Sequence, residues 1–325
     1  MDAEFIKIAE SLSGRPVDQL VLCKSGRNSR VYKVVCGADA YALKSYPPKN
    51  SDHRDRFCTE VRALKYYEAS GNPYAPRLLS LDPVRHVTLL EWLDGEVVGN
   101  PAVCDIEQAL DFITRTHAAR ALGGEAFGLA SEPCLSGAEL YRHISVRLEK
   151  LIVLPELKCY LDSEIVPLLE LARRHAENLA FAAALPKSKQ TLIPADFGFH
   201  NAIRTESGRV RFIDFEYFGW DDPVRLAADF LLHPGRALDA QCANQFRAGM
   251  ISLFRTDEYF ESRLLNLLPL YAIRWVLILL NEFLPERWDA RVFAGETASH
   301  AEIKAQQLKK ARLAADKAVD CLKLP

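Results

Sequence analysis

Hydrophobic and polar residues alternate along much of the first 93 residues, which is the pattern of half-buried β-strands. After a short N-terminal helix, residues 18–46 are rich in β-branched and aromatic side chains and are interrupted by Gly26 and by the sequence CGAD. We expect three antiparallel strands here, joined by two turns. Residues 77–82 (RLLSLD) and 86–93 (HVTLLEWL) predict two further short strands.

One helix is predicted within this segment, over residues 51–71. A Ser-Asp pair opens it, Gly71 closes it, and apolar residues such as Phe57 and Val61 recur at helical spacing. The sequence therefore predicts an N-terminal lobe, residues 1–93, with a five-stranded antiparallel sheet and one inserted helix.

From Asp94 onward the apolar residues recur every three or four positions, which predicts a larger, mainly helical C-terminal lobe over residues 94–325. Two short extended pieces form a small hairpin in this lobe. Helices are expected at 105–119, 136–153, 160–184 and after Pro223, and the extended pieces at 191–194 and 209–215. Together the two lobes predict an α+β protein.

Residues 264–284 are apolar enough to suggest a membrane span. Asn266, Pro269 and Arg274 interrupt the segment, whereas a spanning helix needs about 20 consecutive apolar residues. We therefore expect a buried core helix and no membrane partner.

The composition is that of an ordinary soluble globular protein, with 49% hydrophobic and 26% charged residues. A net charge of −2 gives no general reason to bind nucleic acid. The eight cysteines include no CxxC pair, and the N-terminus lacks the features of a signal peptide. These features predict a cytoplasmic protein with reduced thiols and without a zinc site. The last helix is expected to pack onto the lobe or to contact a second copy, so the chain is a monomer or a homodimer.

A lysine in a predicted strand is the first candidate for chemistry. Lys44 follows alternating residues, and one hairpin upstream the turn SGRNSR could cover phosphates with Gly26, Asn28 and Ser29. Glu60, sixteen residues after Lys44, could pair with its ammonium. The alternative is a surface lysine on an edge strand and a solvated helix glutamate.

The second candidate group lies around a loop between the two extended pieces. Asp196 and Asn201 fall on this loop, and Asp214 ends the second piece in the sequence FIDFE. Amide and carboxylate oxygens suit Mg²⁺ that also holds nucleotide phosphates. An additional aspartate could then accept the proton of a substrate hydroxyl. Ordinary turn chemistry is the alternative for Asp and Asn in a loop.

The motifs SGRNSRVYKV, YALK, LLEWLDGE, DFGFHNAI and FIDFEYFGWDDPVRLAADF occur in this order. In this order they resemble the aminoglycoside phosphotransferase and choline kinase superfamily, the small-molecule relatives of protein kinases. The resemblance extends from about Val21 to about Phe283. It implies a two-lobed, protein-kinase-like fold and a kinase that uses ATP or GTP with Mg²⁺ to phosphorylate a small-molecule hydroxyl.

The resemblance also implies roles for single residues. Lys44 would contact the α- and β-phosphates with Glu60 as its partner, and Asp196 would be the catalytic aspartate. Backbone groups of the hinge LLEWL would meet the adenine, and two residues would bind the metal. The hinge residues are Glu91 and Leu93, and the metal ligands are Asn201 and Asp214.

Two positions depart from the family pattern. The usual His-Gly-Asp is here Pro194-Ala195-Asp196, so the histidine is absent at that position. His200 lies beside the metal asparagine, and we interpret it as a packed or solvated loop histidine. In the sequence DDPVRLAAD, Arg225 replaces the second aspartate of the family's Asp-Pro-x-x-Asp-Leu pattern.

Several other polar and aromatic residues have a structural interpretation. Asp222 is predicted to cap the helix that begins at Pro223, and Asp229 to be structural. Glu216 and Asp221 could add negative charge near the site that would attract a cationic acceptor. The alternative is that they are exposed acids and a helix cap. His117, Tyr271 and Trp275 are interpreted as core residues.

Two other functions are compatible with the motifs. A non-catalytic nucleotide-binding protein would explain the missing histidine. A protein kinase is disfavoured, because no long activation segment ending in Ala-Pro-Glu follows Asp214. The acceptor stays open among aminoglycosides, amino alcohols, sugars and nucleosides.

Overall fold

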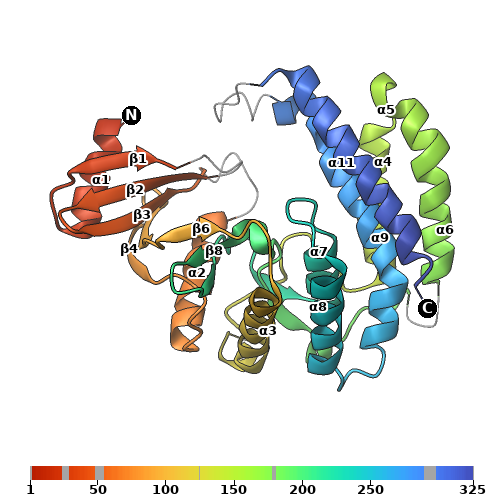
Figure 1. The fold of residues 1–325 in the computed structure, drawn as a ribbon, viewed down its shortest axis with the longest axis horizontal. Coiled ribbons are helices and arrows are strands. Elements are labelled where there is room, and N and C mark those ends of the chain that lie inside the picture. The colour runs from red at the N-terminus through yellow and green to blue at the C-terminus, as the bar shows by residue number, and fades with distance from the viewer. Residues whose placement is uncertain are drawn as a thin grey trace.

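The structure is a computed structural model that describes residues 2–23, 29–47, 55–123, 125–177, 181–288 and 298–324. A sheet-rich lobe lies at one end and a larger, mainly helical lobe at the other (Figure 1). This is the α+β arrangement that the sequence predicts. The boundary at residues 93 and 94 stays a prediction.

The N-terminal lobe contains the predicted five-stranded antiparallel sheet, with strand order β1-β2-β3-β5-β4. Helix α1 (Asp2–Ser13) contributes Ile8 and Ala9 to one apolar cluster with Tyr32 and Leu43 of the sheet. The strands are β1 (Gln19–Leu22), β2 (Arg30–Cys36), β3 (Asp39–Ser45), β4 (Leu78–Asp82) and β5 (Val87–Glu91).

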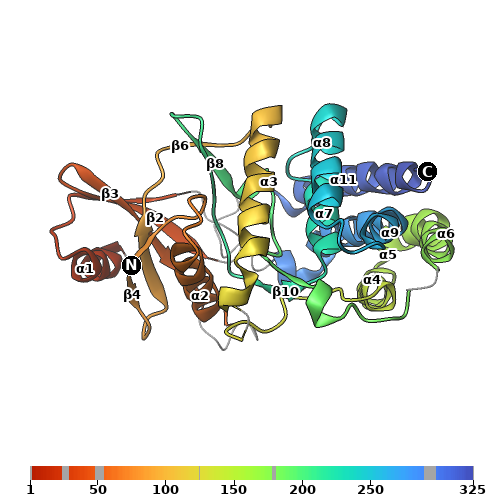
Figure 2. The ribbon, with the colours of Figure 1, turned by 90° about the horizontal axis from the view of Figure 1, so that it is seen from below.

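The inserted helix α2 (Arg56–Ala69) connects the two lobes. Residues 51–54 of the predicted helix lie outside the described residues. Asp55 is the N-cap of α2, since the Asp55 carboxylate accepts the Cys58 N–H at 3.1 Å. At its other end, Tyr67 packs with its ring 5.3 Å from Phe112 of α3. Figure 2 shows α2 between the sheet and α3. Glu60, in the second turn of α2, is buried.

The C-terminal lobe is mainly helical, as predicted. The predicted helix at 160–184 is wrong in extent, because it contains a π-helical turn before Pro167 and ends at Ala176. The helices are α3 (Val103–Ala118), α4 (Gly137–Leu151), α5 (Pro155–Tyr160), α6 (Val166–Ala176), α7 (Pro223–Leu232), α8 (Ala240–Leu253), α9 (Phe260–Leu280) and α11 (His300–Cys321). The shorter helical turns are η2 (Arg120–Gly123), η3 (Leu161–Ile165), η4 (Lys187–Lys189), η5 (Phe199–Asn201) and η6 (Asn281–Phe283).

Two small sheets in this lobe position the predicted catalytic loop. The two predicted extended pieces exist but do not pair with each other, because each finds a partner that the sequence analysis missed. One sheet is β7 (Thr191–Ile193) with β10 (Gly219–Asp221), and the other has the order β6 (Gly95–Val97), β8 (Ala202–Thr205), β9 (Val210–Phe212). The loop that carries Asp196 therefore runs from one sheet to the other.

Helix α9 is the centre of the helical lobe. It packs against α4, α6, α7 and α11, and Tyr271 and Leu277 are fully buried. By length and composition alone, Phe260–Phe283 could cross a membrane, but 72% of that apolar window is buried inside the protein. The predicted core helix is confirmed.

Candidate active site

Lys44, near the end of β3, is buried between two carboxylates. Its Nζ lies 2.6 Å from Glu60 Oε2 and 2.8 Å from Asp214 Oδ1. Burial by itself lowers the pKa of Lys44, but Asp214 and Glu60 raise it well above its ordinary value, so the ammonium stays charged. Glu60 also accepts the Tyr46 hydroxyl at 2.7 Å and the Phe215 N–H at 3.2 Å. The predicted contact between Lys44 and Glu60 is therefore present.

The loop after β7 brings Asp196 and Asn201 together. Ala195 adopts a left-handed backbone conformation with φ 62° just before Asp196. The Asn201 amide nitrogen donates to the Asp196 carbonyl at 3.0 Å and lies 3.4 Å from Asp196 Oδ2. The Ile213 N–H donates to the Asn201 carbonyl at 2.9 Å. This bond holds Asn201 beside the segment that carries Asp214, so residues from two loops meet.

The side chains around Asp214 fit an oxygen-liganded divalent cation. Asn201 uses its amide nitrogen on Asp196, which leaves its amide oxygen as a ligand atom. Asp214, Glu60 and Glu216 place carboxylate oxygens within 4.8 Å of one another. Carboxylate and amide oxygens are the ligands that Mg²⁺ prefers. The donor set is thus compatible with the predicted ligands Asn201 and Asp214.

The alternative interpretation of Glu216 as an exposed acid is wrong. Glu216 is 2% exposed and forms an ion pair with Arg56 of α2. Burial, and next the nearby Asp214 carboxylate, raise the pKa of Glu216 to about 7. Asp221 is fully buried and accepts the Arg225 guanidinium at 2.6 Å. Both carboxylates are already paired with arginine side chains.

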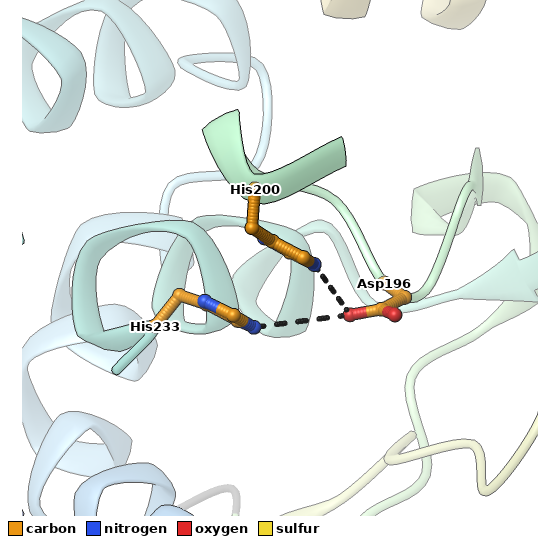
Figure 3. A group of neighbouring side chains, drawn as sticks. All are labelled: Asp196, His200 and His233. Carbon is orange, nitrogen blue, oxygen red and sulfur yellow. Dashed lines mark hydrogen bonds and ion pairs between the residues drawn. The ribbon is translucent and has the colours of Figure 1, made fainter. Parts of the chain in front are cut away.

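Two histidines approach the Asp196 carboxylate, and the sequence analysis missed this. His200 Nε2 lies 3.1 Å from Asp196 Oδ1, and His233 Nε2 lies 3.9 Å from the same oxygen (Figure 3). Burial alone raises the pKa of Asp196, but the hydrogen bond and electrostatic influence of His200, followed by those of His233 and the Asn201 amide, lower it to about 2. In the sequence, the four-residue spacing from Asp196 to His200 was the one sign that this histidine could reach the carboxylate. His233 follows α7, and no sequence pattern connects it with Asp196.

The predicted nucleotide contacts of the N-terminal lobe are described in part. Gly26 and Asn28 lie outside the described residues, and Ser29 directly precedes β2. At the hinge, the Glu91 N–H donates to the Arg77 carbonyl at 3.0 Å, so that N–H is not available to a nucleotide. Leu93 is buried.

The structural interpretations of Asp222 and Asp229 are confirmed. The Asp222 carboxylate caps α7 by accepting the Val224 N–H at 2.9 Å. Asp229 is buried, and its Oδ1 accepts a hydrogen bond from Arg274 Nη1 at 3.0 Å.

His117 is a packed histidine, as interpreted, with Nδ1 2.9 Å from Thr191 Oγ1 and its ring edge-on to Phe254. Tyr271 is a core residue, whereas the Trp275 ring lies edge-on to His233 at 4.6 Å and so reaches the surroundings of Asp196.

Comparison with known proteins addresses the family directly. The family model described as the phosphotransferase enzyme family matches residues 19–259. No curated protein matches the sequence. Among solved structures, spectinomycin phosphotransferase APH(9)-Ia with ADP and spectinomycin has a TM-score of 0.62 at 11% identity, covering 99% of this chain and 98% of that one. Choline kinase LicA from Streptococcus pneumoniae has a TM-score of 0.57 at 15% identity, covering 97% and 99%. A gentamicin complex of APH(2")-IIa has a TM-score of 0.60 at 15% identity, covering 96% of each chain.

At these identities the structures establish a shared fold, and the family model covers most of the chain. The chain therefore belongs to the phosphotransferase enzyme family, which confirms the predicted superfamily and enzyme class.

Proposed function

We propose that this protein is an ATP-dependent and Mg²⁺-dependent kinase that phosphorylates a hydroxyl group of a small molecule. The observation that carries the proposal is the position of Lys44 Nζ between Glu60 and Asp214. Asp196 and Asn201 lie on the adjoining loop. Phosphoryl transfer from a nucleotide requires these groups: a lysine, its carboxylate partner, oxygen ligands for a metal, and a carboxylate at the acceptor hydroxyl.

Each group has a proposed role. Lys44 supplies positive charge to the nucleotide phosphates, and Glu60 fixes the position of its ammonium. Magnesium, held by Asn201 and Asp214, neutralises phosphate charge when bound. Asp196 has a pKa of about 2 and is ionised at neutral pH. Its carboxylate can therefore accept a hydrogen bond from the acceptor hydroxyl and orient that hydroxyl for attack.

The proposed donor is ATP, with GTP as the alternative. The ADP bound to spectinomycin phosphotransferase, which shares this fold, supports a nucleotide site. In the N-terminal lobe we assign the phosphates to the turn with Gly26, Asn28 and Ser29. The hinge residues Glu91 and Leu93 are assigned to the adenine, with Leu93 as the backbone N–H donor because the Glu91 N–H is already used.

The proposed acceptor is a small hydroxylated molecule, and no nucleic acid or membrane partner is proposed. The described residues include all eight cysteines, as free thiols, which supports a cytoplasmic location. Helix α11 packs along α9, which supports a monomer, with a homodimer as the alternative.

The test is a screen for ADP release from Mg-ATP across aminoglycosides, amino alcohols, sugars and nucleosides, repeated with Mg-GTP. We expect one acceptor class to stimulate ADP release. Asp196→Asn is the control and should bind nucleotide normally in a thermal-shift assay while turnover falls by about 10²- to 10⁴-fold. An active Asp196→Asn variant would contradict the role of Asp196. Stabilisation by Mg-ATP without turnover on any acceptor would favour a non-catalytic nucleotide-binding protein.

A further inference from the structure

The Asp196 carboxylate contacts a pair of stacked histidines from two different elements. His200 lies in the helical turn η5, shortly after Asp196, and His233 directly follows α7. Their rings are parallel within 1°, with centroids 3.7 Å apart. Figure 3 shows both Nε2 atoms directed at the same carboxylate oxygen. We propose that His200 and His233 are positioning residues for Asp196 and that they compensate for the histidine missing from the His-Gly-Asp pattern. The inference rests on the proposed role of Asp196.

The hydrogen bonding of His233 determines which of its nitrogens carries the proton. The backbone N–H of Gly235 donates to His233 Nδ1 at 3.0 Å. An imidazole nitrogen that accepts a hydrogen bond has a lone pair and no proton. A neutral His233 therefore carries its proton on Nε2, the atom 3.9 Å from Asp196 Oδ1. The ring presents a positive N–H dipole to the carboxylate.

His200 presents the same kind of donor at shorter range. Its Nε2 lies 3.1 Å from Asp196 Oδ1, and an ionised carboxylate only accepts hydrogen bonds. The other nitrogen, Nδ1, is buried and has no hydrogen-bond partner among the described residues. A Cβ added at Gly198 would lie 2.8 Å from this Nδ1, so the loop backbone passes close to the ring. The proton of neutral His200 thus belongs on Nε2, where it bonds to Asp196.

His233 acts on Asp196 mainly through His200. At 3.9 Å it is too far from Oδ1 for a direct hydrogen bond, but its ring covers one face of His200. The edge of Trp275 supports His233, with ring centroids 4.6 Å apart. A Cβ at Gly235 would lie 2.8 Å from the His233 ring, so the backbone also passes close to this ring. The stack therefore limits rotation of His200 and keeps Oδ1 occupied. The acceptor hydroxyl then uses Oδ2, whose contact within the protein is the longer one from the Asn201 amide, at 3.4 Å.

The same three side chains could be interpreted as a transition-metal site, since their ligand atoms lie within 4.8 Å of one another. A metal on His233 Nε2 would need the lone pair there and the proton on Nδ1. The Gly235 N–H opposes that tautomer, because it already donates to Nδ1. The geometry therefore favours an N–H group at His233 Nε2 over a metal-binding lone pair, with His200 as the hydrogen-bond donor to Asp196.

The first test compares matched variants in steady-state kinetics with Mg-ATP. His200→Leu removes the donor, whereas His200→Gln keeps an amide N–H near the position of Nε2. We expect His200→Leu to lower kcat by about 10- to 100-fold, the usual effect of losing a group that orients an active-site residue. KM for ATP should stay unchanged, and His200→Gln should recover most of kcat. Equal losses in the two variants, or a loss expressed mainly in KM for ATP, would overturn the proposal.

For His233 the matched pair is His233→Phe and His233→Ala. Phenylalanine retains the stacked ring, so His233→Phe should keep more of kcat than His233→Ala. If both variants retain wild-type kcat, His233 has no positioning role and the pair is refuted.

A second readout needs no acceptor and no turnover. Imidazole ¹⁵N spectra of the folded wild-type protein at neutral pH, assigned with His200→Gln and His233→Phe, report the tautomers directly. We expect the Nε2–H tautomer for both rings. An Nδ1–H tautomer at either ring would overturn the proposal, as would stoichiometric Zn²⁺ binding that is lost in both variants. If the wild-type protein turns over no acceptor, the proposed function fails while the spectra still decide the geometry of the histidine pair.

Discussion

The substitution Asp229→Asn tests whether a buried ion network behind the active site stabilises the C-terminal lobe. Asp229 on α7 is 4% exposed. Its carboxylate oxygens accept hydrogen bonds from Arg274 Nη1 of α9 at 3.0 and 3.3 Å, and from Arg225 Nε at 3.3 Å. Arg225 also donates to the Ser131 and Glu132 carbonyls, each at 2.8 Å. The network thus links α7, α9 and the segment before α4. Because α7 ends just before His233, it also supports the surroundings of Asp196.

The expected magnitude follows from what the substitution keeps and removes. Asparagine keeps the size of Asp229 and one acceptor oxygen, but it removes the negative charge between two buried guanidinium groups. Breaking a buried ion pair by removing one partner costs about 3–5 kcal/mol. Arg225 retains Asp221 at 2.6 Å, so we expect the lower end, about 3 kcal/mol. That is a large part of the about 5–15 kcal/mol by which folded proteins are typically stable.

The assay is urea unfolding followed by circular dichroism, with the free energy of unfolding extrapolated to water. The matched control is Asp320→Asn, which removes the same charge from a pair with Lys323 at 3.0 Å where Asp320 is 75% exposed. We expect the control to change the free energy of unfolding by less than about 0.5 kcal/mol. A loss below about 1 kcal/mol for Asp229→Asn, or equal losses in both variants, would show that the buried network does not stabilise the lobe.

Three further predictions concern the site and its supports. Lys44→Met removes the positive charge placed at the nucleotide phosphates and should lower turnover by about 10²- to 10³-fold in the ADP-release assay. A variant whose turnover stays within about tenfold of wild type would contradict the role of Lys44. Burial, and then Arg120, lower the pKa of His117 from 6.5 to about 4, which favours the neutral form in the folded state. The contribution of neutral His117 to the free energy of unfolding is therefore fully present above pH 6.5 and is lost as the pH falls through 4. His117→Gln should make the urea midpoint of unfolding depend less on pH across this window. Parallel pH profiles for wild type and variant would refute that effect. Ala195→Gly should be neutral or stabilising, because the left-handed φ of 62° costs alanine about 1–2 kcal/mol. Ala305→Gly, at an exposed interior position of helix α11, should cost about 1 kcal/mol. Urea unfolding compares the two variants, and equal losses would contradict the strain at Ala195.

Much of the site could be predicted from the sequence because its parts are short and local. The interval from Asp196 to Asn201 spans one loop, and the Asn201 amide does return to Asp196. Lys44 and Glu60 belong to consecutive elements of one lobe, so their contact follows from the strand-helix order. Asp214 is at the end of a short extended segment that the hydrophobic pattern marks clearly.

Local patterns in the sequence account for the individual elements: alternating residues specify the strands, three- and four-residue spacing specifies the helices, and capping residues such as Asp222 set where a helix begins. Pairings between distant segments, in contrast, depend on the packing of the whole chain. Three such pairings join segments that share no sequence pattern from which their contact could be predicted. They are the ion pair of Arg56 with Glu216, the pairing of β7 with β10, and the approach of His233 to Asp196. They arise from packing: burial of their apolar faces positions α2 and α7, and Arg56 at the start of α2 and His233 just after α7 are thereby brought to Glu216 and Asp196. Local patterns specify which side of an element is buried, but the partner across the interface depends on how all the elements pack at once.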